Sequence, residues 1–144
     1  MKILGIDPGT ARMGYGVLHI EKGAKAKVLE VDTLITHQDL PMPKRLKFIH
    51  ERLKSIIDDH EPDVMVIEKL FFNTNVKTAI AVGQARGVAL LASSHRDILL
   101  YEYTALEAKK SIAGFGRASK TEMQEAVKEM LELDNIIKSD DAND

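Results

Sequence analysis

The stretch that decides the fold is residues 1–16, MKILGIDPGTARMGYG, at the start of the chain. An apolar run ends at Asp7, where the dipeptide Pro8-Gly9 turns the backbone. Two glycines flank Tyr15 and lead into a second apolar run, which is typical of another strand. The pattern predicts a hairpin with one carboxylate at the tip of a buried strand. A single Asp after a strand is more often a turn former than a functional group, so the rest of the chain decides its role.

The composition limits the class of protein. With 144 residues the chain has the length of one domain, and we expect a single domain over residues 1–144. The absence of cysteine excludes thiolate metal sites, so a bound metal would need oxygen or imidazole ligands. No apolar stretch approaches the roughly 18 residues of a membrane span and no signal peptide opens the chain, which favours a cytoplasmic protein. A net charge of −2 would confine nucleic-acid binding to local basic patches.

Three strands are expected before the first helix, because residues 25–36 also carry a strand pattern and only short turns separate the runs. This order predicts that the sheet begins antiparallel. A helix follows that ends by Glu61-Pro62. Its apolar side chains recur at steps of three and four: Leu46, Ile49, Leu53, Ile56 and Ile57. Its basic side chains are expected to form a solvated face: Lys44, Arg45, Lys47, Arg52 and Lys54.

A second carboxylate repeats the arrangement of Asp7. Residues 63–68, DVMVIE, hold four apolar residues in a row before Glu68, which is typical of a strand buried on both faces. Because a helix precedes this strand, we expect it to lie parallel to the first strand at the centre of the sheet. Both acids would then stand at the carboxyl ends of central strands, where open α/β sheets place their sites.

The second half of the chain predicts further helices around a fifth strand. Residues 79–92 are rich in Ala and Gly and apolar around much of the helix circumference, which implies burial on two sides. The helix could pack against the core and the sheet of a monomer, or against the core and a partner subunit, and we favour the second. Residues 98–103 are typical of the fifth strand, and 106–112 of a short helix. The last clear helix begins after a glycine-rich turn and is expected to be capped by Ser119 or Thr121.

Two sets of residues are candidates for contacts with nucleic acid. Phe71 and Phe72 follow Glu68 directly and either cap the core or present a ring for stacking on a base. Four basic residues surround the glycine-rich turn and could converge on phosphate, although lysines at helix ends are also ordinary surface residues: Lys109, Lys110, Arg117 and Lys120.

The acidic tail supplies two more carboxylates. If Ser139 or Asp140 caps a helix, Asp141 and Asp144 share one helical face, although Asp140 could replace Asp141 in a shifted register. Like charges gathered within a few ångström need cations, and hard divalent cations suit carboxylate oxygens. Four carboxylates suit two Mg²⁺ ions about 3.5–4 Å apart, the arrangement that hydrolyses phosphodiesters. The order of strands and helices is that of a ribonuclease H-like α/β sheet.

Together these motifs resemble the RuvC family of Holliday junction resolvases over nearly the whole chain. The segments that carry the resemblance are GIDPGT at 5–10, GYG at 14–16, VIE at 66–68 followed by Phe71, GQARG at 83–87 and DAND at 141–144. The resemblance implies a ribonuclease H-like fold with a five-stranded mixed sheet and a homodimer. It also implies an endodeoxyribonuclease that makes paired incisions in four-way DNA junctions with Mg²⁺, for which Mn²⁺ can substitute, during DNA recombination and repair. The implied partner is the branch-migration motor of RuvA and RuvB.

The resemblance also assigns roles to single residues. Asp7, Glu68, Asp141 and Asp144 match the catalytic acids and metal ligands. Phe71 falls where the family has an aromatic residue that stacks on a junction base, and Lys109 and Lys120 match basic positions that contact DNA. Family members continue past the last aspartate with a small apolar helix, so we expect the final helix of this chain to be incomplete.

Other classes share parts of the pattern. A strand followed by Asp-x-Gly-Thr and a second strand also opens the phosphate-binding domains of actin and the sugar kinases, but those proteins need two such domains. A non-catalytic binder of branched nucleic acid is expected to lack the full set of four acids. The segment 83–87 and Phe71 favour the junction enzyme over RuvC-like relatives that process ribosomal RNA.

Overall fold

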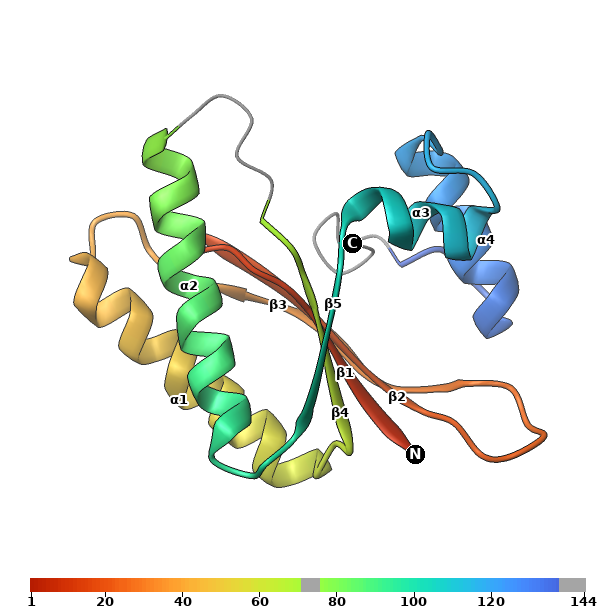
Figure 1. The fold of residues 1–144 in the computed structure, drawn as a ribbon, viewed down its shortest axis with the longest axis horizontal. Coiled ribbons are helices and arrows are strands. Elements are labelled where there is room, and N and C mark those ends of the chain that lie inside the picture. Colours follow the sequence, from red (N-terminus) through yellow and green to blue (C-terminus); the bar gives the residue numbers. More distant parts are fainter. Residues whose placement is uncertain (71–75, 138–144) are drawn as a thin grey trace.

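The computed structural model of the protein describes residues 1–70 and 76–137, in which five strands form one mixed sheet (Figure 1). The strands are β1 (Lys2–Asp7), β2 (Arg12–His19), β3 (Lys27–Ile35), β4 (Val64–Glu68) and β5 (Leu99–Tyr103). They lie in the order β3-β2-β1-β4-β5. The first three pair antiparallel, whereas β4 runs parallel to both β1 and β5. The predicted sheet, antiparallel at one side and parallel at the other, is confirmed.

The helices form two pairs on opposite sides of the sheet (Figure 1). They are α1 (Met42–His60), α2 (Val76–Ser94), α3 (Ala105–Ala113) and α4 (Lys120–Leu131). Helices α1 and α2 lie side by side against one face, and α3 and α4 form a separate pair toward the other. In the part of the chain that the structure describes, no helix combines the length and the hydropathy needed to cross a bilayer.

The core lies between α1, α2 and the sheet face that they cover. Side chains alternate between the faces of a strand, so every second residue of β1 and β2 enters this core. The buried residues are Leu4, Ile6, Met13, Tyr15 and Val17 of the sheet with Ile49, Leu53, Ile57, Ala85 and Ala89 of the helices. The apolar positions predicted for the first helix are therefore those that pack, apart from Leu46, which is half-buried.

Polar caps and turn residues set the ends of the shorter helices. Ser119 caps α4 and Thr104 caps α3, each in a reciprocal pair with the Glu three residues later. The backbone amide of Ser119 lowers the pKa of Glu122 through this hydrogen bond. The structure thus decides between Ser119 and Thr121 as the cap of α4. Helix α2 extends beyond the predicted residues 79–92 at both ends.

Candidate active site

Asp7 and Glu68 lie next to each other at the carboxyl ends of β1 and β4. The parallel register pairs Ile6 with Ile67, so the next residue on each strand is the acid. Neighbouring strands are about 4.8 Å apart, and residues at one level of a parallel pair face the same side of the sheet. Both acids are half-buried. The structure therefore brings together two carboxylates that are 61 positions apart in the chain.

The turn after Asp7 depends on a glycine. A Cβ atom placed on Gly9 would lie 2.0 Å from the carbonyl oxygen of Arg12, a separation that real Cβ atoms essentially never show. On either side of this glycine, Pro8 and Thr10 are buried. The close approach of the Gly9 backbone to Arg12 lets β2 begin only five residues after β1 ends.

A cavity of about 620 Å³ lies over the face of the sheet that holds the two acids. Its walls are mostly apolar and come from the sheet and from α3 and α4, among them Ile3, Val66, Ala108, Ile112, Met123 and Val127. Its polar lining includes Asp7, Glu68, Tyr103 and Lys109. The acid pair thus borders a large, largely apolar space rather than open solvent alone.

The structure places the other predicted site residues in three ways. Lys109 shares the cavity with both acids and is half-buried. Arg117 lies between α3 and α4 and Lys120 is the first residue of α4; both are exposed and outside the cavity lining. Phe71, Asp141 and Asp144 lie outside the described residues, as do Phe72 and Asp140. Within residues 1–70 and 76–137, no three acidic, His or Cys side chains come close enough together to hold a metal.

Arg45, which was predicted to be solvated, instead takes part in a hydrogen-bond network next to the turn that follows Asp7. Arg45 is half-buried, and its Nε donates a hydrogen bond to the hydroxyl of Thr36 at 2.8 Å. That hydroxyl in turn donates to the carbonyl oxygen of Thr10. The prediction of a fully solvated basic face on this helix is therefore wrong for Arg45. The spacing of apolar residues gave no signal for it, because the side chain reaches past the end of the helix to a loop.

A second polar cluster fastens the other end of α1 to the sheet. The hydroxyl of Tyr15 donates to Glu30 at 2.5 Å, and His60 contacts the second oxygen of that carboxylate at 2.6 Å. Burial, followed by the hydrogen bond to Glu30, raises the pKa of Tyr15. Hydrogen bonds from Tyr15 and then from His60 lower the pKa of Glu30. This cluster is structural, since Tyr15 belongs to the core face opposite the two acids.

Comparison with known proteins supplies independent information. The family model described as crossover junction endodeoxyribonuclease RuvC matches residues 3–144. The chain is similar to the crossover junction endodeoxyribonuclease RuvC of Finegoldia magna, with 47% identity over all of this chain and 87% of that protein. Its identity to the protein of the same name from Halothermothrix orenii is 49%, with the same coverage. The structure of Thermus thermophilus RuvC in complex with Holliday junction substrate aligns with a TM-score of 0.93 at 29% identity, covering 99% of this chain and 87% of that one.

These matches span both halves of the chain, including β1, β4 and the segment between α3 and α4. They therefore favour the junction nuclease over the alternative of an actin-like or sugar-kinase-like phosphate-binding domain.

Proposed function

Because the chain belongs to the RuvC family of crossover junction endodeoxyribonucleases, we propose that it resolves four-way DNA junctions by hydrolysing phosphodiester bonds in paired incisions. The protein would act on DNA during recombination and repair, as one nuclease domain in the cytoplasm. The observation that carries this proposal is the placement of Asp7 and Glu68 at the same level of two neighbouring strands. Two carboxylates held side by side on rigid strands are suited to hard cations.

The donor atoms at this site fit a divalent metal, on which members of this family depend. Asp7 and Glu68 offer only oxygen ligands, which suit Mg²⁺ and Mn²⁺ better than softer metals. When bound, a pair of such ions supplies an activated water and stabilises the leaving oxygen in phosphodiester hydrolysis. Asp141 and Asp144 would complete the ligand set. The choice of Mg²⁺, and of two ions, belongs to the proposal.

Three basic residues and one aromatic residue would hold the DNA. Lys109 lies in the same cavity as the acids, so its ammonium group is suited to the phosphate next to the cut. Arg117, in the turn before α4, and Lys120, at the start of α4, are exposed and would contact phosphates further along an arm. Phe71 follows Glu68 by three positions and would stack on a junction base.

The decisive experiment removes one acid and separates binding from cutting. Asp7→Asn keeps the shape of the side chain but removes its charge, so we expect cleavage of a synthetic four-way junction in Mg²⁺ to fall by at least about 10³-fold. Junction binding in Ca²⁺ or EDTA should stay within about twofold, because phosphate contacts dominate affinity. Asp39→Asn is the matched control, since that side chain is 89% exposed and far from β1 in sequence. Cleavage by Asp7→Asn at the rate of the unaltered chain would refute the proposed site.

We also propose that two copies of the chain act together through α2. One side of this helix packs in the core through Ala85 and Ala89, while Ile80 and Leu91 are more than half exposed. A resolvase needs two active sites to make paired incisions, and a second copy would cover these apolar side chains. Sedimentation should show a dimer at micromolar concentration and a shift toward monomer for Ile80→Lys. Phe48→Lys on α1, also an exposed apolar residue, should leave the dimer intact.

The proposed cellular partner is the branch-migration motor formed by RuvA and RuvB. Resolution requires that the junction move along the DNA until a suitable sequence reaches the nuclease, which is work that a separate motor would perform. The family assignment supports this proposal, and co-sedimentation of the chain with RuvA, RuvB and a junction would test it.

A further inference from the structure

We propose that Thr36 and Arg45 are positioning residues for the nuclease reaction, because they hold the turn that follows Asp7. The expected effect on the cleavage rate rests on the proposed function. The claim that these residues hold the turn rests only on the hydrogen bonds of this chain. Neither residue belongs to the cavity lining that contains the acids. Both would therefore act through the backbone of residues 8–11 and without touching the substrate.

The Thr36 hydroxyl stands between two partners. It donates its proton to the carbonyl oxygen of Thr10 and accepts the Nε hydrogen of Arg45 at 2.8 Å. A hydroxyl has one proton and two lone pairs, so these two bonds fix the direction of its O–H bond. The backbone amide of Thr36 also donates to the carbonyl oxygen of Ala11 at 3.0 Å. Two consecutive carbonyl groups of the turn are thus held by one residue.

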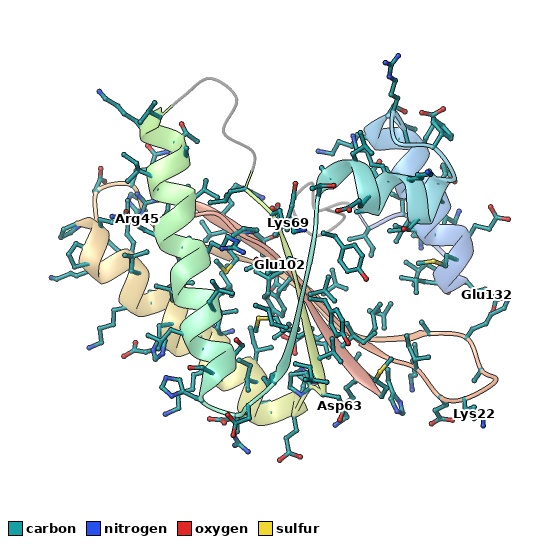
Figure 2. All side chains as sticks on the ribbon, viewed as in Figure 1. Lys22, Arg45, Asp63, Lys69, Glu102 and Glu132 are labelled. Atoms are coloured by element: carbon teal, nitrogen blue, oxygen red, sulfur yellow. The ribbon has the colours of Figure 1, made fainter. Side chains whose placement is uncertain are left out.

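Because these hydrogen bonds are buried, losing one of them is costly in free energy. Thr10 is 8% exposed and Thr36 is 5% exposed, so water cannot readily replace a lost partner. The guanidinium group adds a charge-assisted bond, which is stronger than a bond between neutral groups. Figure 2 shows Arg45 where α1 begins, and its own amide bonds to the carbonyl oxygen of Pro41 at 3.2 Å in the first turn of that helix. The network therefore ties the end of β3 and the start of α1 to the turn after β1.

The hydrogen bonds of Thr36 hold the turn at Thr10 and Ala11, three and four residues after Asp7. The Gly9 backbone passes so close to Arg12 that no side chain fits between them, so a shift of Thr10 or Ala11 would also displace Gly9. Asp7 is the last residue of β1, so its backbone belongs to the sheet on one side and to the turn on the other. A turn free to shift would let the carboxylate of Asp7 change its direction relative to Glu68.

The test uses substitutions that keep volume and remove single hydrogen bonds. Thr36→Val replaces the hydroxyl by a methyl group, and Thr36→Ser restores the hydroxyl. Arg45→Met removes the donor on a helix that is otherwise unchanged, and Arg52→Met, two turns along the same helix and exposed, is its matched control. Each protein is assayed for junction cleavage under single-turnover conditions, for junction binding in EDTA, for Mn²⁺ affinity by calorimetry, and for amide hydrogen exchange.

A positioning role predicts a specific combination of results. Thr36→Val and Arg45→Met should cut about 10-fold more slowly, bind Mn²⁺ more weakly and bind the junction normally, because only the direction of the acid has changed. Amide exchange should accelerate at Thr36 and across residues 9–12, while Thr36→Ser and Arg52→Met should match the unaltered chain. A merely structural role would lower the Tm and leave the cleavage rate and Mn²⁺ affinity unchanged well below that temperature.

The outcomes separate this inference from the proposed function. If the unaltered chain cuts junctions and both Thr36→Val and Arg45→Met cut equally well with unchanged Mn²⁺ affinity, the inference is overturned and the function stands. If the unaltered chain neither cuts nor binds Mn²⁺, the proposed function fails. Hydrogen exchange then still decides whether Thr36 and Arg45 hold the turn, and unchanged exchange in both variants overturns that part as well.

Discussion

Replacing Gly9 with alanine tests how closely the fold and the candidate site are coupled. The added Cβ would lie 2.0 Å from the Arg12 carbonyl oxygen, whereas real Cβ atoms essentially never approach other atoms within 3.0 Å. The turn must therefore open by about 1 Å before the side chain fits. The obstructing atom is backbone at the start of β2, so rotation of a side chain cannot relieve the contact.

The expected cost follows from this geometry. Overpacking that forces a backbone shift typically destabilises a protein by about 1–3 kcal/mol. For a chain of this size, each kcal/mol lowers the Tm by roughly 3–4 °C, so Gly9→Ala should lower it by about 3–12 °C. A misplacement of about 1 Å next to a catalytic group can cost about 10²-fold in rate. We therefore expect junction cleavage to fall about 100-fold at temperatures where the variant is fully folded.

The assay compares thermal unfolding and single-turnover cleavage with those of a matched variant. Gly5→Ala adds the same methyl group four residues earlier, within β1, where the nearest atom would be the Gly16 carbonyl oxygen at an ordinary 3.8 Å. That variant should change the free energy of unfolding by less than about 1 kcal/mol, since ordinary contact brings no strain. Equal stability and equal cleavage rates for both alanine variants would refute the reasoning about the turn.

Two further predictions concern the rest of the chain. Ser119→Ala should remove the cap of α4 and cost about 1 kcal/mol in thermal unfolding, whereas Ser55→Ala on the exposed face of α1 should not. The pKa of Glu30 is lowered from 4.5, so its carboxylate stabilises the fold above pH 4.5 and loses that contribution as the pH falls through the lowered pKa. Glu30→Gln should therefore flatten the fall of Tm with acid below pH 4.5, and an unchanged acid profile would contradict this role.

The sequence predicted the sheet and the adjacency of Asp7 and Glu68 for physical reasons. Apolar runs that end in an acid mark buried strands, and a helix between two such runs makes them parallel, so their carboxyl ends meet. Helix periodicity identified which residues of α1 enter the core, because a side chain three or four positions away shares a face.

The sequence could not predict the polar contacts that hold these elements together. The Thr36 hydroxyl and the Thr10 carbonyl are 26 positions apart, and no periodic pattern links a strand end to a distant turn. Arg45 has the same charge and spacing as its solvated neighbours on α1, and only the folded chain shows that its side chain reaches Thr36. The same holds for the contact between His60 and Glu30.

Polar networks at both ends of α1 fasten this helix to the sheet more firmly than α3 and α4 are fastened. With Arg45 bonded to Thr36 at one end and His60 to Glu30 at the other, α1 cannot detach without also breaking its contacts to β3 and to the loop that follows β3. Helices α3 and α4 instead face the sheet across a cavity, so we expect them to tilt at a lower cost in free energy than α1. Asp7 and Glu68 lie on the sheet, on the face that borders the cavity below α3 and α4. This arrangement would let α3 and α4 move around a bulky substrate while Asp7 and Glu68 stay fixed on β1 and β4.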